Sequence, residues 1–370
     1  MKVLIISGSY PKIKCGVGDY TYILANKLSE NADVTVLTST DAKSFEDDRV
    51  TVKNVVKKWS GLYIIKTILK EIKTGGYDVV HIQFPTVKYK RNSIANYIIL
   101  PFLLRLKGVK VVYTLHEYSN NSKLSKAVRI PAILCSNRIV IVDNLFLDEL
   151  SKKFRRRKDK IRYINIGANV ERSTANEEEI NALRESLKKW DEKLLAHFGF
   201  VNHSKRLDLI LKAMAELKRE NNLKSRLVIV GDFSEERCGK ELYSELTDII
   251  KENGLEDNIT VTGYIEGNVG DYFRASDSAI MLFSNGVSVR NGSVLAGQQE
   301  GVKIITSKPV RKIDVFKEQF YFVDNEVDSV KRAIEIVQNE DRKTYPLGDD
   351  FSWDAIRDKH LSVYNELINR

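Results

Sequence analysis

The stretch Ser284–Leu295 combines residue types that suit the binding of a phosphate group. It is rich in Gly, Ser and Asn, and it follows the apolar run Ser278–Phe283, which predicts a buried strand. Small residues let the backbone turn its N–H groups toward one point, and a helix that begins there adds the positive end of its dipole. Arg290 adds a fixed positive charge with a planar set of donors. These features favour a phosphate or diphosphate site; the alternative is a surface loop that needs small residues to turn.

A second strand–loop–helix opening lies near residue 200. The run Lys193–Gly199 predicts a strand, and the loop after it leads into a helix that begins near Lys205 and Arg206. Positive side chains at a helix N-terminus oppose the helix dipole unless an anion offsets them. The pair therefore indicates a nearby phosphate or, alternatively, two exposed basic side chains.

The first predicted strand, Val3–Ser7, is also followed by a glycine-containing loop. Gly16 and Gly18 precede the predicted helix Asp19–Ser29, and glycines allow a ligand to approach the backbone closely. The third glycine of the dinucleotide-binding fingerprint is missing, which argues against a nicotinamide cofactor. A plain strand–helix connection is the alternative.

Two further predicted strands carry candidate polar residues. His116 ends the strand Lys110–His116, where it could donate a proton or hydrogen-bond a hydroxyl group, or simply cap the strand edge. Because side chains alternate along a strand, His81 and Gln83 share one face of the strand Asp78–Phe84. We expect His81 to pack beneath the site.

The elements that must position these residues alternate between strands and helices. Several strands are unbroken runs of Val and Ile, as in sheets that are covered on both faces. This rhythm predicts an α/β protein with doubly wound parallel sheets, whose ligands bind at the carboxyl ends of the strands. The rhythm stops at residues 168–192 and then restarts, which predicts two lobes with a cleft between them. The expected domains are residues 1–170, a linker and helix at 171–192, a second lobe at 193–350, and a C-terminal helix at 351–370 that packs toward the first lobe.

Length, charge and cysteine content limit the class of protein. The 370 residues exceed one ordinary core, and the formal charge of +9 favours acidic partners such as nucleotides or anionic lipid. The sequence shows no long apolar run and no signal peptide, and its three cysteines are widely separated, so we expect a cytoplasmic protein. No zinc spacing, recognition helix or aromatic RNA-binding motif is present, so we do not expect nucleic acid as a partner.

Two stretches of the first lobe mix basic and apolar residues. Ser151–Lys160 is a dense basic run, and Lys88–Lys107 places basic residues around aromatic and aliphatic ones. This composition suits the surface of an anionic membrane, so we expect peripheral association with the inner face of the cell membrane. The alternative is an ordinary helix and a solvated charge run.

Taken together, the chain resembles the retaining glycosyltransferases of family 4, which have the GT-B fold of two facing Rossmann-like lobes. The resemblance spans nearly the whole chain and rests on the order and spacing of several motifs. These motifs are Cys15–Ala25, Asn165–Val170, Phe198–Asp208, Val228–Asp232, Val261–Tyr264 and Gly286–Gly301.

The resemblance implies transfer of a sugar, with retention of configuration, from a nucleotide sugar to a glycan or lipid-linked acceptor, as in bacterial surface polysaccharide or glycoconjugate synthesis. It implies no cofactor and no metal, and we favour UDP over GDP as the nucleotide. The second lobe would bind the donor and the first lobe most of the acceptor. The residues carried over as donor-binding are Gly16, Gly18, Lys205, Arg206, Tyr264, Gly286, Val287, Ser288, Arg290, Asn291, Gly292 and Ser293. His116 would be catalytic, reaching the transferred sugar, and Asp19, Tyr20 and Gln83 would contact the acceptor.

The chain also departs from the family pattern. Two glutamates spaced E-x7-E in many members are Ser288 and Ala296 here, with Glu300 one helical turn further on as a candidate substitute. The arginine often found before the diphosphate lysine is Phe200. A non-catalytic binding or scaffold subunit is therefore one alternative, and another two-lobed enzyme, such as an epimerase or oxidoreductase, is a second. We expect an active enzyme with an unusual donor site.

Overall fold

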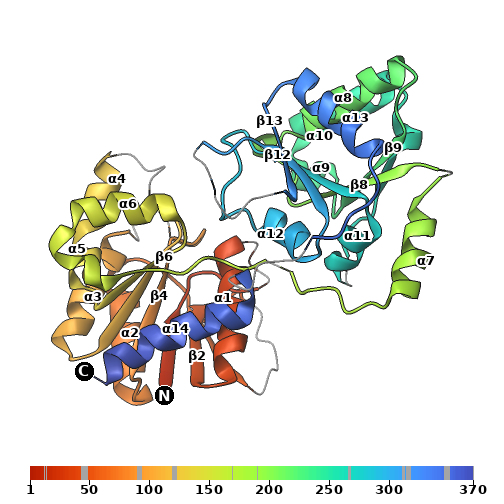
Figure 1. The fold of residues 1–370 in the computed structure, drawn as a ribbon. Coiled ribbons are helices and arrows are strands. Elements are labelled where there is room, and N and C mark those ends of the chain that lie inside the picture. Colours follow the sequence, from red (N-terminus) through yellow and green to blue (C-terminus); the bar gives the residue numbers. More distant parts are fainter. Residues whose placement is uncertain are drawn as a thin grey trace. The chain divides into compact units, whose positions relative to one another are not determined.

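The fold is described from a computed structural model of the chain. The structure describes residues 1–370 except 12, 14, 43–48, 90–93, 119–122, 169, 190, 266–267, 311–312, 314–317, 346–350 and 370. The chain divides into two compact units (Figure 1). The first unit is Met1–Gly167 with Asp349–Arg370, and the second is Ala168–Gly348.

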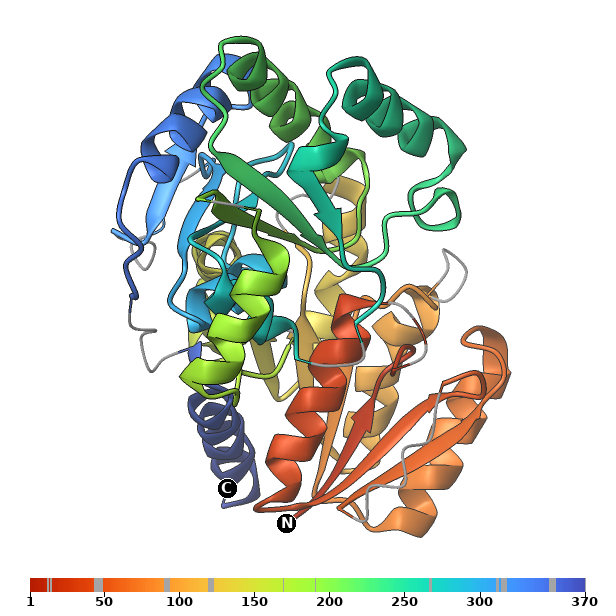
Figure 2. The same ribbon diagram turned by 90° about the vertical axis from the view of Figure 1, so that its right-hand side faces the viewer.

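The first unit is built on a seven-stranded parallel sheet in the order β3-β2-β1-β4-β5-β6-β7. Its strands are β1 Lys2–Ile6, β2 Asp33–Ser39, β3 Val50–Val56, β4 Val79–Phe84, β5 Lys110–Leu115, β6 Arg138–Ile141 and β7 Ile161–Tyr163. The central strands are apolar and buried because helices cover both faces of the sheet, as the unbroken Val and Ile runs predicted. Figure 2 shows this layering from the side.

The helices of the first unit come from its N-terminal segment Met1–Gly167 and from its C-terminal segment Asp349–Arg370. They are α1 Gly16–Ser29, α2 Gly61–Gly75, α3 Ile94–Leu106, α4 Lys123–Val128, α5 Ile130–Cys135, α6 Asn144–Lys153, the 3-10 helix η1 Arg155–Lys160, and α14 Trp353–Ile368. The C-terminal helix α14 packs along α1, so both termini lie in this unit (Figures 1 and 2). A Cβ atom at Gly167 would lie 2.7 Å from the Trp353 ring, so glycine is needed where α14 begins to pack.

The second unit is built on a six-stranded parallel sheet in the order β10-β9-β8-β11-β12-β13. Its strands are β8 Lys193–Phe198, β9 Ser225–Val230, β10 Ile259–Val261, β11 Ser278–Met281, β12 Lys303–Ser307 and β13 Phe320–Val323. Its helices are α7 Glu177–Leu187, η2 His203–Lys205, α8 Leu207–Arg219, α9 Glu235–Cys238, α10 Lys240–Glu252, η3 Glu256–Asn258, α11 Val269–Ala275, α12 Gly292–Gln299 and α13 Val327–Gln338. The edge strand β13 was not predicted, because it is only four residues long and half-buried at its centre.

Helix α7, which we expected in a linker-and-helix segment at 171–192 between the lobes, belongs to the second unit. Asn176 and Glu179 form a reciprocal capping box that begins the helix. Arg184 then donates to both carboxylate oxygens of Asp277 at 2.8 Å and to the Ala275 carbonyl at 2.7 Å. These bonds, made by largely buried groups, hold α7 against α11 and the start of β11, so the helix of the 168–192 segment packs as part of the second unit, which begins at Ala168.

Candidate functional site

The loops that follow β8 and β11 meet at the carboxyl edge of the second sheet. The two strands are neighbours, with Ser278 paired to Leu195, so their outgoing loops are adjacent. The backbone N–H of Ser284 donates to the carbonyl of Ser204 at 2.9 Å. The Lys205 Nζ lies 3.5 Å from the Ser293 hydroxyl oxygen, within hydrogen-bond range. The structure thus brings together the two loops that the sequence identified separately.

Lys205 is a partly buried cation at the centre of this edge. Its ammonium lies 4.3 Å from the centre of the Phe283 ring, close enough for a cation–π interaction. Burial lowers the pKa of Lys205 to about 8. An anion bound beside the ammonium would oppose that effect, because it favours the charged form. The lysine is therefore placed where a phosphate group would stabilise it.

Glycine is required at two turns of this edge. Gly199, directly after β8, has φ of +131°, a conformation that L side chains rarely adopt. Gly286 has φ of +74°, and a Cβ atom there would lie 2.4 Å from the Lys308 carbonyl oxygen. Both glycines therefore serve the loop geometry itself, beside any role in letting a ligand approach.

The loop before α12 is closed by its own side chains. The Asn291 amide oxygen accepts from the Ser288 N–H at 2.6 Å, and the Ser288 hydroxyl oxygen accepts from the Arg290 N–H at 3.3 Å. These two backbone groups are thus engaged within the loop. Among the residues that the structure describes, the N–H groups of Gly292 and Ser293, in the first turn of α12, have no hydrogen-bond partner. They are the backbone donors with which this loop could bind an anion.

The remaining donor-site candidates differ in how they are placed. The Val287 side chain is buried, 3% exposed, and its N–H donates to the Ser307 carbonyl at 3.3 Å. The Arg206 guanidinium donates two bonds of 3.1 Å to the Asp208 carboxylate, so its charge is already paired. Tyr264 follows β10 at the same edge of the sheet and is 77% exposed, which leaves its ring open for stacking.

Two residues that we did not identify from the sequence support the donor loop. The Ser307 hydroxyl oxygen accepts from the Phe283 N–H at 2.9 Å and lies 2.6 Å from the Asn325 amide oxygen. The Asn325 amide nitrogen donates to the Phe283 carbonyl at 3.0 Å. Asn325 sits in a turn that has no motif of its own, so only the fold reveals this contact.

Glu300 is placed away from the donor loop. It ends α12, and because α12 starts at the carboxyl edge of the sheet, Glu300 lies at the other end of the helix. It is 7% exposed, and its carboxylate accepts from the Ser173 N–H at 3.0 Å. Ala296 is completely buried. Glu300 is thus a poor substitute for the family's second glutamate, since its carboxylate binds the chain that enters this unit.

In the first unit, His116 lies just past the end of β5. Its backbone N–H donates to the Phe84 carbonyl at 2.8 Å, which continues the pairing with β4. Its ring Nε2 donates to the Gln83 amide oxygen at 2.7 Å, and the Tyr20 ring meets it edge-on with 5.0 Å between ring centres. The imidazole is 7% exposed, so its orientation is closely determined.

Two of the expected acceptor-binding residues are buried in this structure. Tyr20 is 2% exposed and Gln83 is completely buried, so neither side chain has a surface to offer an acceptor. Both instead hold His116. Asp19, in the first turn of α1, is partly exposed, and burial raises its pKa to about 6, so it stays a candidate for acceptor binding.

The first glycine loop is shaped by close packing. A Cβ atom at Gly18 would lie 3.2 Å from the Ser9 carbonyl carbon and 3.3 Å from the Tyr10 nitrogen, so glycine lets α1 start close to the loop after β1. Gly16, the first residue of α1, is exposed. The expected donor contacts of both glycines stay predictions. Over the described ranges, no group of three or more His, Cys, Asp and Glu side chains could hold a metal ion.

Both halves of the chain match known protein families. The family model Glycosyltransferase Family 4 matches residues 15–172, and the model Glycosyl transferases group 1 matches residues 178–343. The two matches together span both units, and the sheets are those of two Rossmann-like lobes. The chain belongs to the group 1 glycosyltransferases with the GT-B fold.

Individual relatives agree with this family. A glycosyltransferase of Methanocaldococcus jannaschii that is described as uncharacterized is 22% identical, with 98% of each chain covered. A glycosyltransferase from Rickettsia africae is similar in structure, with a TM-score of 0.75, 15% identity and coverage of 100% of this chain and 99% of that one. Anabaena HepE, solved in complex with UDP and glucose, has a TM-score of 0.69, 15% identity and coverage of 100% and 98%. At these identities the solved structures show the shared fold.

Proposed function

We propose that this glycosyltransferase moves a sugar from a nucleoside-diphosphate sugar, preferably a UDP sugar, to a glycan or lipid-linked acceptor with retention of configuration. The second unit binds the donor and the first unit most of the acceptor. The observation that supports this proposal most directly is the position of Lys205. Its ammonium lies beside the Ser293 hydroxyl, in the first turn of α12, where the N–H groups of Gly292 and Ser293 could bind an anion. The UDP in the HepE complex supports the choice of nucleotide.

The proposed site stabilises the leaving group by charge and oriented dipoles. As the bond to the sugar breaks, the diphosphate gains negative charge and the sugar becomes oxocarbenium-like. Lys205 and the N–H groups of Gly292 and Ser293 would stabilise that charge without a metal ion. His116 would position a hydroxyl group of the transferred sugar, since its ring is held in one orientation by Gln83.

The second candidate function is a non-catalytic binding subunit, and one observation favours it. Ser288 and Ala296 replace the paired glutamates of many family members, and Glu300 does not take their place at the loop. The resemblance implies that the second glutamate binds the ribose hydroxyls of the donor, and loss of that contact should raise KM more than it lowers kcat, so we favour the enzyme.

The test separates binding from turnover. The protein is screened with UDP, GDP and a panel of their sugars by thermal unfolding, where a ligand at 100 times its Kd stabilises the folded state by about 2.7 kcal/mol. Turnover is then measured with a lipid acceptor fraction from bacterial cells. We expect transfer of at least one sugar, and a kcat lower by about 10²-fold in His116→Ala. Nucleotide-sugar binding without turnover across the panel would support the binding subunit instead.

We also propose peripheral association with an anionic membrane, as in synthesis of bacterial surface polysaccharide or glycoconjugates at the inner face. Ile99, Phe102 and Leu106 lie at helical spacing on α3 and are 45%, 48% and 68% exposed. Arg105 and Lys107 beside them are exposed. An apolar stripe next to basic side chains suits the membrane interface.

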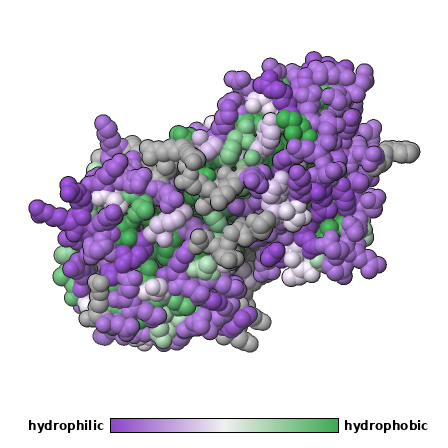
Figure 3. Space-filling model, viewed as in Figure 1, coloured by the Kyte–Doolittle hydropathy of each residue, from purple (hydrophilic) through white to green (hydrophobic). Residues whose placement is uncertain are grey.

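The surface around the molecule is mostly hydrophilic on the face that is drawn in Figure 3. Figure 3 shows a largely hydrophilic face with scattered hydrophobic patches. Lys90 and Arg91, which belong to the basic-apolar stretch Lys88–Lys107, lie outside the described residues. Among the described residues, no helix combines the length and the apolar composition needed to cross a bilayer.

A further inference from the structure

A buried chain of hydrogen bonds runs from His116 to the C-terminal helix. The His116 Nε2 lies 2.7 Å from the Gln83 amide oxygen, and the Gln83 amide nitrogen lies 3.4 Å from the His81 Nε2. The His81 Nδ1 lies 2.7 Å from the hydroxyl of Tyr364 on α14. All four side chains are 7% exposed or less. The chain therefore joins β5, β4 and α14 through the interior of the first unit.

In this series of hydrogen bonds, the donor and acceptor of one bond determine the donor and acceptor of the next. An amide oxygen can only accept, so His116 carries its proton on Nε2. The Gln83 amide nitrogen can only donate, so the His81 Nε2, 3.4 Å away, accepts, and the Thr114 hydroxyl, 2.6 Å from the same nitrogen, can turn its O–H toward it. His81 therefore carries its proton on Nδ1 and donates it to the Tyr364 oxygen. In such a network, a change of direction at one end is transmitted to the other.

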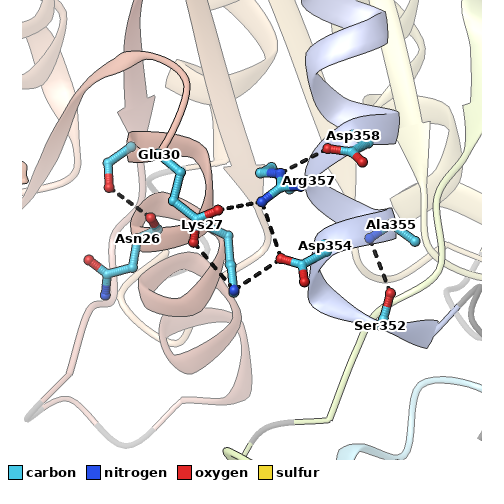
Figure 4. A network of polar contacts seen from close by, with 9 residues as sticks. Asn26, Lys27, Glu30, Ser352, Asp354, Ala355, Arg357 and Asp358 are labelled. Carbon is cyan, nitrogen blue, oxygen red and sulfur yellow. Dashed lines mark hydrogen bonds and ion pairs between the residues drawn. The ribbon is translucent and has the colours of Figure 1, made fainter.

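Helix α14 is held in a defined position where it meets α1. Lys27 on α1 pairs with Asp354 at 3.0 Å, and Arg357 pairs with Glu30 and, at 3.2 Å, with Asp354 (Figure 4). One exposed ion pair contributes little, but a connected set fixes geometry better than isolated pairs do.

The rest of α14 is anchored to the same sheet. Near its end, the Glu366 carboxylate accepts from Arg138 at 3.1 Å and from Arg162 at 2.8 Å. Between the two anchors, the Tyr20 hydroxyl lies 3.4 Å from the His360 Nε2. Tyr20 also contacts the His116 ring, so α14 reaches that ring by two routes.

We propose that α14 sets the tautomer and the orientation of His116 through Tyr364, His81 and Gln83, which act as positioning residues. The proposal rests on the proposed role of His116 in sugar transfer. If the Tyr364 hydroxyl is removed, His81 loses the acceptor for its Nδ1 proton. The tautomer of His81 with the proton on Nε2 is then the more stable one, because the Thr114 oxygen can accept that proton. The Gln83 amide must then reverse, and His116 accepts at Nε2 and carries its proton on Nδ1.

The test observes the histidine rings directly. The chain has five histidines, so the ring nitrogens of ¹⁵N-histidine-labelled protein can be assigned by NMR. In Tyr364→Phe, we expect the protonated and unprotonated nitrogen signals of His116 to exchange places. Tyr77→Phe is the matched control, because it removes a hydroxyl that donates to Glu71 at 2.6 Å in the same unit. An unchanged His116 tautomer in Tyr364→Phe overturns the proposal.

A second variant tests the route. Gln83→Leu removes the only amide in the chain of bonds, so adding Tyr364→Phe to it should leave the His116 signals where Gln83→Leu alone puts them. A further change in the double variant would show that the influence does not pass through Gln83. Thermal unfolding of each variant establishes that the comparison is made on folded protein.

Turnover separates this proposal from the proposed function. With an active donor, Tyr364→Phe should lower kcat by about tenfold or more while the donor KM stays unchanged, and Tyr77→Phe should alter neither. If the NMR linkage is present but no nucleotide sugar of the panel is consumed, the proposed function fails and the positioning role stands. Transfer at the wild-type rate in Tyr364→Phe would overturn the positioning role and leave the function intact.

Discussion

The ammonium of Lys205 lies 4.3 Å from the centre of the Phe283 ring, although the two residues follow different strands of the second sheet. This contact joins the loop after β8 to the loop after β11. It also removes Lys205 from water, which lowers its pKa to about 8. The donor half of the proposed site is built around this pair.

Lys205→Ala should weaken UDP binding by about tenfold or more, because it removes a charge-assisted hydrogen bond worth roughly 1.5–3 kcal/mol. Titration calorimetry measures the change. Lys308→Ala is the matched control, since Lys308 is a more exposed lysine of the same unit that pairs with Asp324 at 2.5 Å. Equal affinity in Lys205→Ala and the wild type would place the diphosphate elsewhere.

UDP affinity should also depend on pH. Only the protonated ammonium attracts the diphosphate, so above the phosphate's own second pKa of about 6, binding should be constant up to the Lys205 pKa of about 8 and weaken as pH rises through it. Bound UDP favours the charged form, which moves the midpoint of the decrease upward. Lys205→Arg should remove this decrease, because guanidinium stays protonated over the range. A decrease of the same size in Lys205→Arg would assign it to another group.

Phe200→Arg should strengthen UDP binding, by about tenfold if the new guanidinium reaches the phosphates. Phe200 follows Gly199 in the loop after β8 and is 61% exposed, so the substitution disturbs no core packing. Phe200→Leu controls for loss of the ring. Unchanged or weaker UDP binding in Phe200→Arg would mean that this position does not face the phosphates.

The first unit should lose stability in mild acid through His360. Burial lowers the pKa of His360 from 6.5 to about 4, so the unfolded chain binds a proton there before the folded chain does. This contribution is fully present above pH 6.5 and is lost as the pH falls toward 4, and it amounts to about 3 kcal/mol over that range.

Urea unfolding at pH 7 and at pH 5 measures this loss. His360→Gln should lose less stability between the two values than the wild type, by about 2 kcal/mol. His203→Gln, at an exposed position, is the control. Identical losses in the wild type and in His360→Gln would contradict the assignment.

Replacing the apolar stripe of α3 should reduce membrane binding. The triple change of Ile99, Phe102 and Leu106 to Ser removes exposed apolar area without emptying the core, since each side chain is at least 45% exposed. Co-sedimentation with anionic vesicles should fall relative to the wild type, and wild-type binding should decrease with salt. Wild-type protein that stays in the supernatant at low salt would contradict the membrane proposal.

Much of the fold could be predicted from the sequence, because the patterns that indicate strands and loops are local in the sequence. Unbroken apolar runs such as Val3–Ile6 identify buried parallel strands, and the residues after each run must then gather at one edge of a sheet. Lys205 and Ser293 were both placed in a donor site for that reason. The order of the motifs was sufficient to indicate the family.

The tertiary structure decided what each candidate side chain does. Tyr20 and Gln83 were expected to contact the acceptor but are buried, because Tyr20 packs against His360 and Trp353 of α14 and Gln83 lies on the central strand β4 beside His116. The bond between His81 and Tyr364 spans 283 positions, and no periodicity or motif links residues so distant. Sequence patterns determine which residues reach the edge of a sheet, whereas burial and hydrogen-bond partners depend on packing between elements that are remote along the chain.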